Sequence, residues 1–202
     1  MKFILGEKKE MTQVFDDKGV VSAATIISAG PMVVTQVRTK EKDGYESVQV
    51  GYGTRKAKRI SKAVKGHVKE LGSFKEIREF RDNDPLNLER GAKIDVSTFS
   101  VGDVVVVSAI SKAKGFQGVV KRHGFKGGPR THGQKHSERE PGSIGGGLRT
   151  KVPRGKRMAG RMGGRRITSK GQTIVSVKPE TGEIFIRGAV AGRRGTLVEL
   201  IG

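Results

Sequence analysis

The sequence predicts a mainly β protein with a small α element, in which one β-barrel domain carries a long, basic, glycine-rich extension. Three observations predict this architecture. Short β-rich runs separated by turn residues occupy both ends of the chain. Residues 111–166 combine many Lys, Arg and Gly residues with few large aliphatic ones. Residues 54–71 show helical spacing of apolar residues.

The β-rich runs are short and regularly punctuated. Turn signals such as Asp43-Gly44 and Pro179 to Gly182 separate many of them. Runs of this length and spacing favour a barrel or a sandwich. The runs are KFIL, MTQVF, VVSAATIISA, MVVTQVRT, ESVQVGY, KIDVSTF and DVVVVSAI, followed later by TIVSVK, EIFIRGAV and TLVELIG.

The last three runs follow the basic segment and are too few to form a stable domain alone. We therefore expect one split barrel domain, made of residues 1–110 and 167–202. Its chain leaves near Ile110 and returns near Ile167. The basic segment, residues 111–166, is then an extended loop inserted into the domain and not a tail.

A basic helical insert is predicted at about residues 55–80. Its apolar residues, Ile60, Ala63, Val64, Val68 and Leu71, recur at roughly helical spacing. The run SFKEIREF, residues 73–80, is expected to add a short turn or helix that ends near Asp84-Pro85. The basic side chains of the insert either contact RNA or keep its surface solvated: Arg55, Lys56, Lys58, Arg59, Lys62 and Lys65.

The charge of the chain points to an anionic partner. The net charge is +20, and residues 112–166 hold 16 Lys or Arg, two acids and 14 of the 30 Gly residues. The segment has no amphipathic face with large apolar residues, which disfavours binding to a membrane surface. No run reaches the roughly 18 apolar residues of a membrane span, and the N-terminus lacks a signal-peptide core. We expect a soluble, cytoplasmic protein.

Catalytic and cofactor chemistry finds little support in the sequence. The absence of Cys excludes disulfides, Cys-ligated zinc and thiol catalysis. Gly155-Lys156 is followed by Arg157 and not by Ser or Thr, so no phosphate-binding P-loop pattern is present. His132 and His136 leave a metal-dependent enzyme as a remaining hypothesis, but Gly133 disfavours the helix that would align them. We predict no enzyme activity, no cofactor, no metal and no small-molecule substrate.

RNA contact suits the basic segment for three reasons. Lys and Arg neutralise phosphates, Arg adds planar bidentate contacts, and Gly lets the backbone approach closely. DNA stays an alternative, although a long irregular loop suits folded RNA better and no helix-turn-helix or zinc finger appears. Aromatic residues are 5% of the chain and Trp is absent, which disfavours a base-stacking platform.

The predicted RNA contacts are the basic side chains and histidines of this segment: Lys112, Lys114, Lys121, Arg122, His123, Lys126, Arg130, His132, Lys135, His136, Arg139, Arg149, Lys151, Arg154, Lys156, Arg157, Arg161, Arg165 and Arg166.

Several motifs give the chain a family resemblance that runs through nearly its whole length in order. They are MTQVFDDKG (11–19), VVTQVRTKEKDGYESVQVGYG (33–53), IREFRDNDP (77–85), FSVGDVVVV (99–107), SKAKGFQGVVKRHGFKGGPRTHGQKHSEREPGSIG (111–145) and GKRMAGRMGGRRIT (155–168). With these motifs the sequence closely resembles the bacterial family of ribosomal large-subunit protein three.

The resemblance implies a translation-protein-type β-barrel with a long extension and a structural role in the large ribosomal subunit. It implies direct binding to large-subunit ribosomal RNA near its 3′ end, help in nucleating subunit assembly, and an extension that reaches toward the peptidyl-transferase centre. Large-subunit proteins fourteen and nineteen are the implied neighbours, and no catalytic activity is implied. The competing hypothesis is a free-standing RNA- or DNA-binding regulator or RNA chaperone.

Carried over by position, the resemblance assigns an outgoing arm to Gly115–His123 and a return arm to Gly155–Arg166. Met158 and Met162 are expected to pack the arms together or to fill gaps against RNA. The tip departs from the family pattern, since GSIGGGLRTKVPRGKR lacks an aromatic residue that family members often have. The tip residues are Gly145, Gly146, Gly147 and Leu148.

Overall fold

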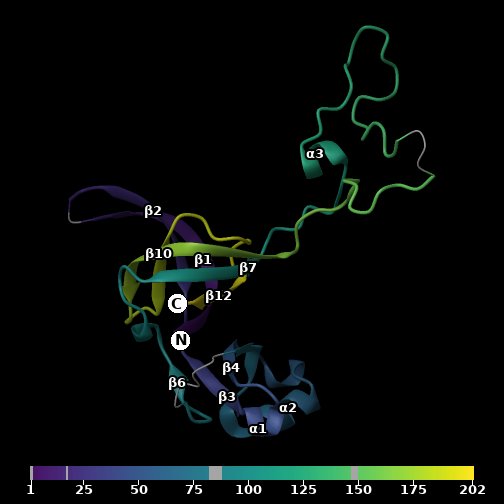
Figure 1. Ribbon diagram of the computed structural model, residues 1–202. Coiled ribbons are helices and arrows are strands. Elements are labelled where there is room, and N and C mark those ends of the chain that lie inside the picture. The colour runs from purple at the N-terminus through teal and green to yellow at the C-terminus, as the bar shows by residue number, and fades with distance from the viewer. Residues whose placement is uncertain (1, 17, 82–87, 147–149) are drawn as a thin grey trace. The chain divides into compact units, whose positions relative to one another are not determined.

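Six antiparallel strands close a barrel in the computed structural model, which describes residues 2–16, 18–81, 88–146 and 150–202 (Figure 1). The order around the barrel is β1-β12-β7-β10-β11-β2. The strands are β1 (Phe3–Phe15), β2 (Val21–Ser28), β7 (Val104–Ile110), β10 (Arg166–Lys178), β11 (Glu183–Arg187) and β12 (Leu197–Ile201). The mainly β prediction and the barrel are therefore confirmed.

Alternating apolar residues explain why these strands close on a core. Val105 and Val107 of β7 point inward, as do Ile184 and Ile186 of β11, and all four are buried. Gly6 in β1 allows β1 and β2 to approach closely, because a Cβ atom there would lie 2.5 Å from Cγ2 of Ile27. Strands far apart in sequence thus share one apolar interior.

A separate four-stranded sheet has the order β5-β4-β3-β6. Its strands are β3 (Met32–Arg38), β4 (Ser47–Thr54), β5 (Phe74–Phe80) and β6 (Lys93–Ile94). The expectation that all the β-rich runs belong to one barrel was therefore wrong for MVVTQVRT, ESVQVGY and KIDVSTF. The core is nevertheless continuous, since buried Val34 and Val50 of this sheet belong to the same apolar cluster as the barrel residues.

The helix or turn expected at residues 73–80 was also wrong, because this run forms strand β5. Phe80 pairs with Val48 of β4, and its ring stacks on that of Phe3 with 4.4 Å between centroids. Burial of Phe80 against β1 and β4 outweighs the weak local helical preference of the run.

The single helix expected at residues 54–71 is shorter and broken. The segment forms η1 (Ala57–Arg59), α2 (Lys62–Val68) and η2 (Lys69–Leu71), while Thr54 ends β4. Ser61 caps α2 by accepting a hydrogen bond from the Val64 N–H at 3.4 Å. Only Val68 of α2 is buried, so too little apolar surface is covered to support one long helix.

The remaining elements are short. α1 (Lys40–Asp43) ends at Gly44, which has φ of 79°, and η3 (Val96–Thr98) precedes β7. β8 (Phe116–Gln117), α3 (Val119–His123) and β9 (Gly160–Arg161) lie in the basic segment. The chain divides into two compact units, residues 1–110 with 166–202, and residues 111–165.

Candidate nucleic-acid interface

Backbone hydrogen bonds join the two arms of the basic segment into a ladder, visible in Figure 1 as two neighbouring traces below α3. Phe116 pairs with Arg161 and Gln117 with Gly160. The Met162 N–H donates to the Gly115 carbonyl at 2.9 Å, and the Lys114 N–H donates to the Met162 carbonyl at 2.9 Å. The pairing of the two arms therefore determines which residues of the segment lie opposite one another.

Side chains of α3 fasten the outgoing arm to the return arm a second time. Nη1 of Arg122 donates to the Met158 carbonyl at 2.6 Å, and Nε2 of His123 lies 3.1 Å from the same oxygen. Gly160 leaves room for the guanidinium, since a Cβ atom there would lie 2.8 Å from Nη1 of Arg122. Arg122 and His123, both predicted to contact RNA, thus have a structural role within the segment.

Two glycines permit the closest approaches of backbone to backbone. Gly163 has φ of 72°, and a Cβ atom there would collide with the Lys112 carbonyl oxygen across the ladder. Gly127 has φ of 74°, and a Cβ atom would collide with the Glu138 carbonyl oxygen. At these positions glycine is required by both conformation and space.

Most of the predicted contact side chains are exposed. Arg122 and His123 are half-buried, and the other described members of the set are exposed. Among the described residues of this unit, the single ion pair joins Nε of Arg130 to Oε2 of Glu138 at 3.6 Å. Arg149 and the tip residues Gly147 and Leu148 lie outside the described residues, whereas Gly145 and Gly146 are exposed.

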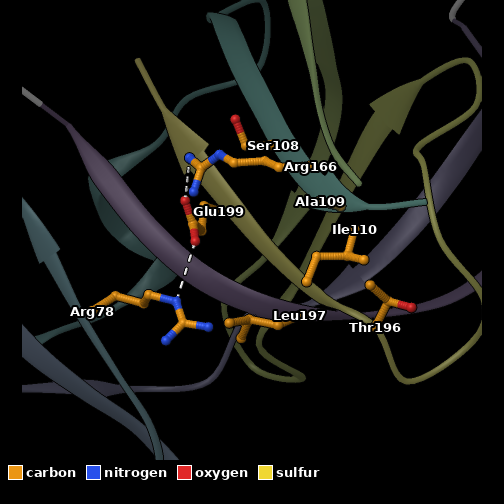
Figure 2. A pocket seen from close by; sticks show the side chains of 8 residues that line it. All are labelled: Arg78, Ser108, Ala109, Ile110, Arg166, Thr196, Leu197 and Glu199. Atoms are coloured by element: carbon orange, nitrogen blue, oxygen red, sulfur yellow. Dashed lines mark ion pairs between the residues drawn. The ribbon is translucent and has the colours of Figure 1, made fainter. Parts of the chain in front are cut away.

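Arg166 belongs to β10 in the first unit, where Glu199 holds it in place (Figure 2). Nη2 of Arg166 lies 2.5 Å from Oε2 of Glu199, and Nε of Arg78 lies 3.3 Å from the other carboxylate oxygen. The three side chains border a cavity of about 300 Å³ that Ile110 and Leu197 also line. Arg166 is exposed too, but it is ion-paired, unlike most of the described cations of the second unit.

The second unit has almost no core. Val119, 2% exposed, is its only buried residue among residues 111–146 and 150–165. Met162 is half-buried and Met158 is exposed, and the packing of the arms by these methionines stays a prediction. Hydrogen bonds and glycine geometry define this unit, because burial contributes little.

A second group of basic side chains, the one predicted for the helical insert, lies on and around η1 and α2. All six predicted side chains, from Arg55 to Lys65, are exposed. Nη2 of Arg90 donates to the His67 carbonyl at 3.3 Å and to the Val68 carbonyl at 3.4 Å, which places a further cation at the C-terminal end of α2. The sequence patterns did not predict this position for Arg90.

His132 and His136 are both exposed, and His132 has φ of 61°. The described residues contain no group of three or more His, Cys, Asp or Glu side chains placed to hold a metal ion. Within the same residues, no helix has the length and apolar character to cross a membrane.

Phe116 was not among the predicted contacts, although it lies in the ladder beside Arg161. The signal that could have found it is an aromatic residue one position after Gly115 in a run without acids.

The fold and the site together define a class of protein. It is a β-barrel protein with an exposed, cationic insertion whose two arms are joined by backbone hydrogen bonds. The sequence profile of the family described as Ribosomal protein L3 matches residues 63–184. A large ribosomal subunit protein uL3 of Roseiflexus sp. is 49% identical over 96% of this chain and 94% of its own length. The corresponding protein of Acidothermus cellulolyticus is 45% identical over 98% of this chain and 90% of its own. That of Chlorobium phaeobacteroides is 45% identical over 100% and 98%.

The chain belongs to the ribosomal protein L3 family. The resemblance inferred from the motifs is thereby confirmed.

Proposed function

We propose that the second unit, residues 111–165, binds large-subunit ribosomal RNA through its exposed cations. The chain is a structural constituent of the large ribosomal subunit, because its family and its curated relatives are large-subunit ribosomal proteins. It is not an enzyme, and its location is the cytoplasm, within the subunit. Contact with ribosomal RNA and with other ribosomal proteins accompanies that role.

One observation carries the proposal for the second unit. Its described cations other than Arg122 are exposed and have almost no acidic partners among the described residues, and the described backbone that carries them has a single buried residue. A segment with so little core gains stability when phosphates neutralise its charge and release counterions. Folded RNA supplies phosphates at the density that such a surface needs.

The finer parts of the role follow the family resemblance. We assign the binding site to ribosomal RNA near its 3′ end, a part in nucleating subunit assembly, and an extension directed toward the peptidyl-transferase centre. Proteins fourteen and nineteen of the large subunit are the proposed neighbours. The exposed cations of η1 and α2 form a second proposed RNA contact.

Charge reversal in the return arm tests the proposal. Arg161→Glu with Arg165→Glu should weaken binding to a transcript of the 3′-terminal part of large-subunit rRNA. Each lost phosphate contact should make the plot of log affinity against log salt less steep by about 0.7–0.9. The midpoint of barrel unfolding should stay unchanged, since both residues lie outside the first unit.

The matched control makes the same change of charge elsewhere. Lys18→Glu with Lys170→Glu alters two exposed lysines of the first unit. This control should keep most of the affinity. An equal loss in both double variants would mean that net charge, and not the return arm, drives binding.

Sedimentation separates the structural role from the alternative of a free-standing regulator or RNA chaperone. A structural constituent migrates with the large subunit after a wash at moderate salt. A chain that stays in the unassembled fraction would favour the regulator.

A further inference from the structure

We propose that Phe116 is a base-stacking residue, whose ring receives one unpaired nucleobase of the bound RNA. The inference rests on the proposed function and names a contact of a different kind from its phosphate contacts. An aromatic ring offers a stacking face to any base, and stacking of one base on an aromatic side chain contributes substantially to single-strand binding.

The exposure of the ring is the first observation. Phe116 is 76% exposed, the largest fraction among the large apolar side chains of the described residues. Its neighbour Val119 is buried, so the same arm does cover an apolar side chain where it can. Leaving a phenyl ring in water has a cost that a partner would remove.

The exposed ring lies on a segment whose backbone is hydrogen-bonded to the opposite arm. Cross-arm hydrogen bonds precede it at Lys114 and Gly115, and Phe116 itself pairs with Arg161 across the ladder. The side-chain amide of Gln117 also donates to the Lys114 carbonyl, which links the residues on either side of Phe116. When the two arms are paired, as they should be in the RNA complex, these hydrogen bonds support the ring in position for a base.

The ring face is also free of competing partners. Among the part of the chain that the structure describes, Phe116 takes part in no ring stacking and no cation–π contact, whereas Phe125 lies 6.0 Å from the His123 ring. The Arg161 guanidinium lies toward Gly164, where a Cβ atom would be 3.2 Å from its Nη2. Arg161 thus stays close enough to take a phosphate without covering the ring.

Charge decides between a nucleobase and a protein side chain as the partner. No acidic residue occurs between Asp103 and Glu138, nor between Glu140 and Glu180. The ring therefore stands on an arm that repels another basic protein and attracts RNA. One stacking residue among cations fits a single splayed base, in agreement with the low aromatic content that argues against a stacking platform.

Substitution to leucine removes the π face and keeps an apolar side chain. Phe116→Leu should weaken binding to the same rRNA transcript roughly 10-fold. The salt slope should not change, because no phosphate contact is lost. Phe15→Leu is the matched control, since Phe15 is 66% exposed in β1. It should bind within about two-fold of the wild type.

A fluorescent variant observes the contact directly. The chain has no Trp, so Phe116→Trp introduces a single indole at the proposed site. Its emission should be strongly quenched when the transcript binds, and affinity should be retained, because indole stacks on bases at least as well as phenyl. Phe15→Trp should show no such quenching.

Several outcomes would overturn the inference. Wild-type affinity in Phe116→Leu would do so, as would indole emission of Phe116→Trp that is unchanged at saturating RNA. Emission that responds only after other large-subunit proteins are added would assign the ring to a protein contact. If the wild-type chain itself fails to bind the transcript, the proposed function fails together with the inference.

Discussion

Tyr52 shows how a single residue joins the two sheets of the first unit. It lies in β4, is 7% exposed, and its hydroxyl donates to the Ser28 carbonyl at the end of β2 at 2.9 Å. Burial, with a smaller contribution from the Glu7 carboxylate, raises the pKa of Tyr52 to about 12. The neutral phenol is therefore part of the folded structure.

The raised pKa predicts a stability change at high pH. An unfolded tyrosine ionises near pH 10, whereas folded Tyr52 keeps its proton until about pH 12. Its contribution is full below about pH 10 and is lost as pH rises toward 12. The urea midpoint of the wild type should thus fall more steeply over this range than that of Tyr52→Phe.

Tyr52→Phe should also lower the unfolding free energy by about 1 kcal/mol at neutral pH, because one hydrogen bond is lost. The difference in absorbance at about 295 nm between wild type and variant reports the ionisation of Tyr52. A midpoint near pH 10 in that difference would contradict the buried position.

Single elements show what sequence patterns can and cannot predict. The barrel strands β7 and β12 were predictable, because their alternating aliphatic residues face one interior. β5 was not, because Phe80 is fixed by contact with Phe3, which is distant in sequence. Local periodicity cannot reveal such a partner.

In the predicted insertion, composition was informative, whereas the contacts between residues were not predictable. Its cations and glycines followed from composition alone. The pairing of Phe116 with Arg161, and the anchoring of Arg166 by Glu199, depend on strands that meet only in the fold. The sequence could therefore predict the kind of surface but not the exact partners within it.

The cross-arm ladder should depend on Gly163. Gly163→Ala places a methyl group against the Lys112 carbonyl and forces an L residue into a positive φ, which costs about 1 kcal/mol before any collision. The ladder should open, and amide exchange of Lys114 and Met162 in the RNA complex should become faster. Affinity for rRNA should fall several-fold.

Gly145→Ala is the control for that change, since no described atom beyond its two chain neighbours lies within 4 Å of a Cβ built there. It should leave exchange and affinity as in the wild type. Unchanged exchange in Gly163→Ala would show that the arms are not held at that distance.

At the scale of the whole molecule, the two units differ in what stabilises them. The first has an apolar core that includes both sheets, and the second has one buried residue among those described. The first should therefore fold without RNA, whereas backbone hydrogen bonds of the second should open readily until phosphates neutralise its cations. Most of the net positive charge lies in the unit that gains most from binding.

Hydrogen exchange of the chain, free and bound to the rRNA transcript, tests this account most directly. In the free chain, amides of the barrel strands should be strongly protected, and those of residues 111–165 should exchange rapidly. On binding, the largest gain in protection should fall in residues 111–165. Strong protection of that unit in the free chain, or a gain confined to the first unit, would contradict the claim that the insertion is the principal RNA-binding surface.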